Sequence, residues 1–310
     1  MKLHLSPAPH VHSPQTTRAL MLNVLVALIP CAIAGVYIFG FNAILLMLVS
    51  TLSAVAGEAI IQKLLGQKSR VGDLSAAVTG LILALNLSPR TPWWVAMVGS
   101  LFAVIVVKGL FGGLGDNFLN PALAARAFLL VCWPRYLTTW ATPLAADAVA
   151  GATPLANPAG YTLGQLFLGN IPGSIGEVCK PAILLGLVYL LATKTITWQI
   201  PLYMTAFTGA FCLLLGSGFT ESILSGGVLF AAVFMATDYV TCPMSQMGQI
   251  VYAAGIGLII ALIRKFGLYP EGVTFAILLM NVATPVIDRF TRRRVYGYED
   301  NKKKEAKANG

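Results

Sequence analysis

The chain has 310 residues, of which 57% are hydrophobic and only 11% are charged. Soluble domains carry about 25% charged residues, so this composition excludes an ordinary water-soluble enzyme and indicates a membrane protein. The formal net charge of +9 would suit a nucleic-acid-binding protein, but the basic residues are distributed as in a membrane protein, and no nucleic-acid partner is expected.

Ten apolar segments follow one another along the chain. A run of about 20 apolar residues crosses a bilayer, and lipid leaves a spanning segment of this kind no alternative to a helix. We therefore predict an all-α integral membrane protein with about ten transmembrane helices, at 20–40, 42–65, 74–88, 94–111, 120–134, 181–194, 198–217, 222–237, 247–265 and 271–288. Segments 74–88, 120–134 and 222–237 are short for lipid-facing spans and are expected inside the bundle.

The basic residues predict the orientation. If the leader 1–19 lies in the cytoplasm and the spans alternate, most Lys and Arg residues, among them Lys63 and Lys108, fall on the cytoplasmic side. This asymmetry is the one that membrane proteins show. The basic tail 289–310 is then a cytoplasmic topology signal, and the long segment 135–180 lies outside.

Two short segments resemble each other and predict an internal repeat. AAVTGLILALNLSP (76–89) and GGVLFAAVFMATDYVTCP (226–243) both run to a polar residue, Asn86 or Asp238, followed by a hydroxyl and a proline. Five spans per unit would make the second unit inverted, as in transporter-like folds with a site at the repeat interface. The units would be 20–134 and 181–288. Similarity of composition alone is the alternative.

Few ionisable groups lie within the spans, and such groups usually mark a pathway or a buried pair. Glu58 lies in the second segment, Arg126 lies in the fifth, and Asp116 precedes the fifth. Arg126 is expected to pair with Asp116, to bind an anionic group, or only to fix helix packing. Helix ends expose unpaired carbonyls and amides, so Asn86 and Asp238 are candidate ion-facing or flavin-facing residues, and Arg126 within its span is a further candidate pathway or ion-facing residue. The alternative is that both short helices end in tight turns, with Asp238 acting as a local cap.

Residues 147–156, DAVAGATPLA, place one acid and one hydroxyl among small residues in the external segment. Thr153 followed by Pro154 is typical of a helix N-cap with proline at the first helical position. The five cysteines are scattered and form no CxxC pair, and no metal site is predicted from them.

The same stretch is similar to the flavinylation motif Asp-x-x-[Ser/Ala]-Gly-Ala-Thr, at which a flavin transferase attaches FMN to the threonine through the FMN phosphate. A threonine that attacks phosphorus must be reachable, and small neighbours allow a second enzyme to approach it. Relatives often have Ser where this chain has Ala150, but a small residue there does not block attachment. The matching residues are Asp147, Ala150, Gly151, Ala152 and Thr153.

The resemblance extends over most of the chain. The chain is similar to the D subunits of Rnf electron-transport complexes and to the related B subunits of sodium-pumping NADH:quinone reductases, although Tyr239 stands where relatives often carry Pro. The stretches that carry it are SPAPHVHSPQTTRALM (6–21), GGLGDNFLNPALAARAFL (112–129), GATPLA (151–156), GNIPGSIGEVC (169–179) and FMATDYVTCP (234–243).

This resemblance implies a membrane component of an ion-translocating oxidoreductase that does not turn over alone. Such a complex moves electrons between ferredoxin and NAD and couples this to Na⁺ or H⁺ movement across the bacterial inner membrane. The resemblance also implies FMN on Thr153, a non-covalent riboflavin without an assigned position, and partner subunits A, B, C, E and G. The rival hypothesis is a small-solute transporter or channel without a redox role, which the repeat alone would suit.

Overall fold

The computed structural model describes residues 16–66, 70–111, 113, 115, 117–143, 150–151, 154–155, 160–267 and 272–291. The first half contains α1 (Thr17–Phe39), α2 (Phe41–Leu64), the 3₁₀-helix η1 (Val71–Asp73), α3 (Ser75–Leu85), α4 (Trp93–Leu101), the π-helix η2 (Phe102–Gly109), α5 (Pro121–Cys132) and α6 (Pro134–Thr138). The second half contains the strands β1 (Trp140–Ala141) and β2 (Ala150–Gly151), then α7 (Leu163–Leu168), α8 (Lys180–Ala192), α9 (Gln199–Leu214), α10 (Phe219–Leu224), α11 (Val228–Phe234), α12 (Gln246–Phe266) and α13 (Val273–Thr291).

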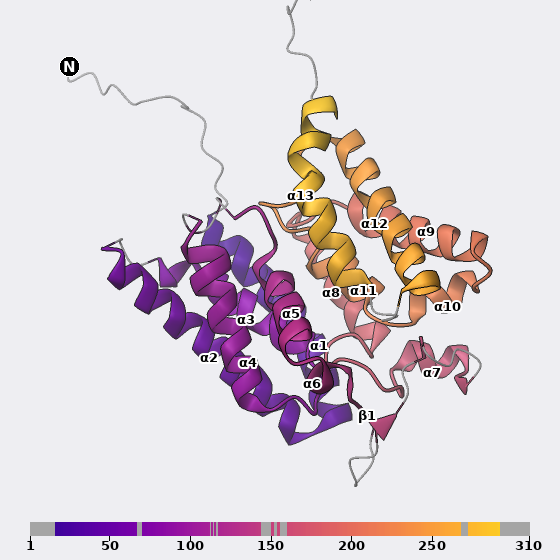
Figure 1. Cartoon of the computed structure of the whole chain (residues 1–310), viewed down its shortest axis with the longest axis horizontal. Helices are drawn as coiled ribbons and strands as arrows, with labels where there is room; N and C mark the ends of the chain where they lie inside the picture. The colour runs from indigo at the N-terminus through magenta and orange to yellow at the C-terminus, as the bar shows by residue number, and fades with distance from the viewer. Residues whose placement is uncertain are drawn as a thin grey trace, which may run out of the picture.

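Each of the ten predicted apolar segments contains helix, in agreement with an all-α membrane protein. Four helices in the described part of the chain, α1, α2, α12 and α13, are long and apolar enough to cross a bilayer. In Figure 1, α2 to α5 gather on one side of the bundle and α9 to α13 on the other. The upper end of α13 lies opposite α6, β1 and α7, which gather at the bottom of the view.

Local chemistry explains where several helices begin. Asn120 accepts hydrogen bonds from the amides of Ala122 and Leu123 at 3.1 and 3.3 Å, and Pro121 occupies the first turn of α5. Thr162 begins α7 through a capping box with Gln165. A side-chain acceptor at the N-cap satisfies amides that have no partner inside the helix.

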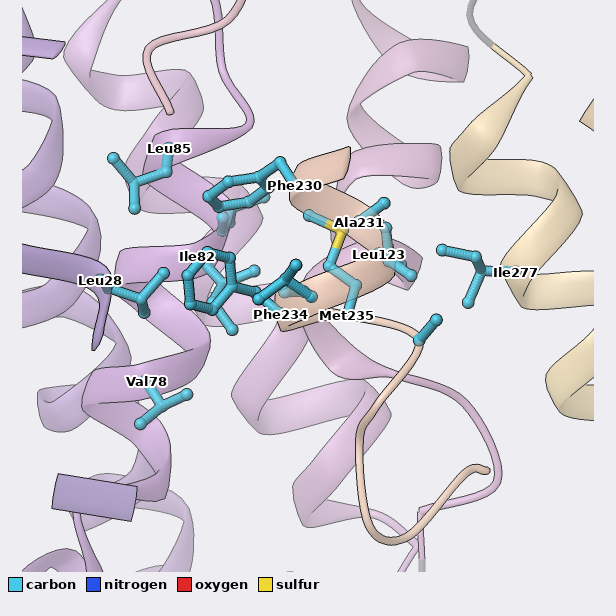
Figure 2. Close-up of a cluster of buried hydrophobic side chains, with 14 of the residues drawn as sticks. Leu28, Val78, Ile82, Leu85, Leu123, Phe230, Ala231, Phe234, Met235 and Ile277 are labelled. Atoms are coloured by element: carbon cyan, nitrogen blue, oxygen red, sulfur yellow. The ribbon is translucent and has the colours of Figure 1, made fainter. Parts of the chain in front are cut away.

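The two short helices α3 and α11 lie at the centre of the molecule. Figure 2 shows Ile82 and Leu85 of α3 facing Phe230 and Phe234 of α11, with Leu123 of α5 beside them. These side chains belong to one hydrophobic cluster and are almost fully buried. The expectation that short helices lie inside the bundle is confirmed for α3 and α11.

The segment 222–237 is not one helix, as predicted, but two. It divides between α10 and α11, and the break contains Gly226 with a φ of 65°. The left-handed region suits glycine, so the break is encoded locally. α11 also ends at Phe234, so the prediction that this helix extends to Asp238 is wrong. For α3 the prediction is confirmed, because Asn86 is its C-cap.

The halves approach each other closely where α8 crosses α1. A Cβ atom added to Gly186 would lie 2.6 Å from the carbonyl oxygen of Ala27 and 2.7 Å from Cζ of Phe234. Small residues at crossings let membrane helices pack backbone to backbone. This contact ties the two halves together beside α11.

Candidate functional site

The C-terminal end of α3 is completed by a distant loop. The amide of Gly176 donates to the carbonyl of Leu85 at 2.7 Å, and the amide of Ile175 donates to Leu87 at 3.1 Å. Carbonyls in the last turn of a helix have no partner inside the helix. This loop therefore supplies hydrogen-bond donors to the C-terminal end of α3. A Cβ on Gly176 would lie 2.7 Å from Cβ of Leu85, and the position therefore requires glycine.

Arg126 of α5 lies at the same end of α3. Its Nη1 donates to Oδ1 of Asn86 at 2.9 Å, and Nδ2 of Asn86 donates to the carbonyl of Ile82 at 2.7 Å. Arg126 and Asn86 line a small cavity of about 20 Å³ together with Leu155 and Glu177. The structure thus brings together two of the three candidate ion-facing residues. Asp116, the expected partner of Arg126, lies outside the described residues.

Asp238 lies at a different place. Its Oδ2 accepts a hydrogen bond from Oγ1 of Thr241 at 3.1 Å, and its carbonyl accepts from the amide of Cys242 at 3.1 Å. It lines a cavity of about 80 Å³ together with Thr79, Lys108 and Asn120. Asp238 therefore combines the predicted local turn with a position on a partly polar cavity.

The two cavities are lined by different residues of α3 and α11 and of their C-terminal ends. Ile82 and Phe234 line the Asp238 cavity, whereas Asn86 and Met235 line the Arg126 cavity. Figure 2 shows Ile82, Phe234 and Met235 in the apolar cluster at the centre. The arrangement places Arg126 with Asn86 on one side of an apolar layer and Asp238 on the other.

α5 holds the ends of both short helices. Its N-cap, Asn120, donates through Nδ2 to the carbonyl of Met235, the C-cap of α11, at 3.2 Å. Six residues later, Arg126 bonds to Asn86, the C-cap of α3. The predicted similarity of the two helix ends therefore has a structural counterpart in one helix that contacts both.

A buried ion pair lies beside the Asp238 cavity. Nζ of Lys108 is 2.5 Å from Oε1 of Glu58 and 2.5 Å from Oγ of Ser75, and Lys108 and Glu58 are each 3% exposed. Lys108 lies in the π-helix η2. The charge pattern of the sequence predicts Lys108 as a flanking cytoplasmic charge and indicates no partner for Glu58. The available signal was Glu58 itself, because a carboxylate inside a span requires a partner.

The predicted flavinylation motif lies only in part within the described residues. Ala150 and Gly151 form β2, which pairs antiparallel with β1 so that Trp140 lies opposite Gly151. Asp147, Ala152 and Thr153 lie outside the described residues. Pro154, which follows Thr153, is buried. The backbone is therefore paired just before the threonine and packed just after it.

A family model described as the NQR2, RnfD, RnfE family matches residues 4–297. The chain belongs to this family. All of the residues named above in α3, α5 and α11 fall inside the matched range.

Relatives within this family are named as the D subunits of oxidoreductase complexes. The D subunit of the "Na(+)-translocating ferredoxin:NAD(+) oxidoreductase complex" of Acetobacterium woodii is 47% identical, over 99% of both chains. That of the "Proton-translocating ferredoxin:NAD(+) oxidoreductase complex" of Clostridium ljungdahlii is 39% identical, over 94% of this chain and 96% of the relative. That of the "Ion-translocating oxidoreductase complex" of Stutzerimonas stutzeri is 40% identical, over 90% of this chain and 91% of the relative.

Membership of the NQR2, RnfD, RnfE family confirms the resemblance drawn from the sequence. The family relationship supports a component of an oxidoreductase complex and gives no support to the small-solute transporter. The loop 169–179 is one of the stretches that carry this resemblance, and the structure gives it a role. Ile175 and Gly176 of this loop complete α3, and Glu177 lines the Arg126 cavity.

Proposed function

We propose that this chain is the D subunit of an ion-translocating ferredoxin:NAD oxidoreductase complex, a membrane component that takes part in electron transfer coupled to ion movement. The observation that carries the proposal is the 47% identity with the Acetobacterium woodii relative along 99% of both chains. The names of the relatives include both sodium and proton translocation, so the coupling ion is Na⁺ or H⁺. The chain acts within a complex with the other subunits, for which the resemblance indicates A, B, C, E and G.

The electron relay in this proposal is FMN attached to Thr153. Attachment forms a bond between the threonine oxygen and the FMN phosphorus of FAD, the hydroxyl loses its proton, and AMP leaves as the pyrophosphate bond breaks. A flavin transferase performs this step during maturation. When bound, FMN supplies a carrier that takes up one or two electrons. The motif residues Asp147, Gly151 and Ala152 support the assignment, and the β2 pairing and buried Pro154 flank Thr153. The non-covalent riboflavin stays a prediction without an assigned position.

The orientation places both termini in the cytoplasm and the 135–180 segment outside a bacterial inner membrane. The end of α13, which precedes the basic tail, lies opposite α6, β1 and α7 in Figure 1. The positive-inside rule supports a cytoplasmic side at this end of α13, because the sequence that follows it is basic.

The architecture in this proposal is ten spans in two inverted five-helix units. Helices that would correspond pack on each other, since α1 contacts α8 and α5 contacts α13. Pairs inside the units also correspond, because α2 contacts α3 and α4 while α9 contacts α11 and α12. A pseudo-twofold axis in the membrane plane would produce this pattern.

Asn86, Arg126 and Asp238 are the proposed ion-facing or flavin-facing residues. Two partly polar cavities with apolar side chains between them support this assignment. Arg126 and Asn86 line one cavity and Asp238 lines the other, so the three residues form two separate sites.

Replacement of Thr153 tests the flavin. Thr153→Ala, co-expressed with flavin transferase, is expected to abolish the fluorescent band of the denatured chain in a gel and to leave membrane insertion intact. Thr162→Ala is the matched control, because it removes a helix cap worth about 1 kcal/mol and leaves the motif unchanged. Retained fluorescence in Thr153→Ala would contradict the assignment.

A further inference from the structure

A polar cavity of about 290 Å³ lies beside the residue that follows Thr153. Pro154, Leu155 and Leu166 form one part of its wall, and Ser217, Glu221 and Arg264 contribute to the other. The volume is far larger than the roughly 10–15 Å³ that a single water needs. Pro154 directly follows Thr153 in the chain, so the described residue next to the proposed attachment point lines this cavity.

Arg264 of α12 is held by the end of α10. Its Nη1 donates to the carbonyl of Ser222 at 2.6 Å, and its Nη2 donates to the carbonyl of Ser225 at 3.0 Å. These bonds fix a guanidinium in the cavity wall, and a guanidinium stays charged at any physiological pH. Arginine is suited to phosphate because its planar N–H groups match phosphate oxygens.

Leu155, two residues after Thr153 in the chain, and Arg264 both lie beside Gly226. A Cβ on Gly226 would lie 2.8 Å from Cδ1 of Leu155 and 3.5 Å from Nη2 of Arg264. A side chain larger than hydrogen at position 226 would therefore collide with Leu155, and the φ of 65° also suits glycine. The break between α10 and α11, which sequence analysis did not predict, forms the wall that receives the motif segment.

The polar groups of the cavity match the arm of a tethered flavin. A phosphodiester on Thr153 would carry one negative charge, and the ribityl chain that follows it carries hydroxyl groups. Arg264 complements the phosphate, whereas the carboxylate of Glu221 would repel it and instead accept hydrogen bonds from hydroxyls. Ser217 can donate or accept.

We propose that this cavity binds the ribityl phosphate arm of the flavin on Thr153, with Arg264 supplying the positive charge for its phosphate. The inference rests on the proposed attachment at Thr153. Arg264 acts here as a positioning residue, because it holds the arm and so fixes the distance from the isoalloxazine ring to its electron-transfer partners.

Fluorescence anisotropy of the flavinylated full-length chain tests the cavity. The chain is purified in detergent after co-expression with flavin transferase, and the signal of Thr153→Ala is subtracted to remove any non-covalent flavin. Arg264→Gln removes the charge, and Ser217→Trp fills the cavity without altering the Arg264 bonds. Lys265→Gln and Ser217→Ala are matched controls, because Lys265 is an adjacent exposed cation that does not line the cavity.

The expected result is a fast depolarising component in Arg264→Gln and Ser217→Trp that is absent from the wild type and both controls. The band of the denatured chain in a gel reports covalent flavin separately. Normal flavin content with unchanged anisotropy in both variants would overturn the cavity assignment and leave Thr153 attachment standing. A wild-type chain without covalent flavin would overturn the proposed attachment itself, and the cavity assignment with it.

Discussion

Arg126 and Asn86 join α5 to the end of α3 through a hydrogen bond of 2.9 Å. The guanidinium reaches a C-cap whose amide nitrogen already bonds to the carbonyl of Ile82. A charged donor therefore lies at the carbonyl end of a short helix, where positive charge is favourable.

The contact between Arg126 and Asn86 predicts that the effects of replacing the two residues on stability are not additive. Arg126→Ala and Asn86→Ala should each lower the free energy of unfolding by about 1–3 kcal/mol, because each removes a hydrogen bond to a charged group. The double variant should cost less than the sum of the two singles, as expected for residues in contact. Thermal unfolding of the purified chain in detergent measures this. Arg135→Ala, at an exposed arginine of α6, is the control, and strictly additive losses would contradict the coupling.

Replacing one residue of the Lys108–Glu58 pair should lower stability more than replacing both. Glu58→Leu or Lys108→Met alone should lower stability by about 3–5 kcal/mol, because the remaining charge is buried without its counterion. The combined replacement should recover most of the loss, since two apolar side chains replace two desolvated charges. The amount of folded chain in membranes and its thermal stability report the result. A double variant no better than the singles would show that Lys108 or Glu58 has a role beyond their mutual pairing.

Replacement of Asp238 should impair electron transfer or its coupling to the ion gradient and leave the proposed flavin on Thr153 in place. In the assembled complex, Asp238→Asn should slow electron transfer or uncouple it from the ion gradient, because the amide removes a carboxylate from the cavity wall. Asp288→Asn is the matched control, since Asp288 bonds to the amide of Met244 and lines none of the three cavities described above. Gradient formation and electron flux are measured together with in-gel fluorescence at Thr153. Normal coupling in Asp238→Asn would leave only its local role in the turn with Thr241.

The orientation predicts selective labelling. In a chain without other cysteines, a membrane-impermeant thiol reagent should label Gly160→Cys in intact cells and should not label Lys303→Cys. Labelling of both after the membrane is opened provides the control for reactivity. Labelling at Lys303 in intact cells would reverse the orientation and with it the external position of the flavin segment.

The long and short apolar segments predicted helices well, because hydrophobic runs and caps such as Asn120 are local signals. Asn86 as the end of α3 was predictable for the same reason. The break at Gly226 was missed, since one or two glycines in an apolar run do not reveal that Arg264, 38 residues later, holds the carbonyls at the break. The Lys108–Glu58 pair was missed because a contact between α2 and η2 is set by packing, which sequence spacing alone does not give.

The bonds from Ile175 and Gly176 to the end of α3 also set an order for biogenesis. α3 emerges from the ribosome about 90 residues before the amides that complete it, and at about 5–20 residues per second this interval lasts roughly 5–20 s. During that time the exposed carbonyls of Leu85 and Leu87 must be satisfied by water or by the insertion machinery. The N-terminal half therefore reaches its final structure only after the segment that contains Thr153 has been translated, so the proposed attachment residue is already part of the chain when α3 is completed.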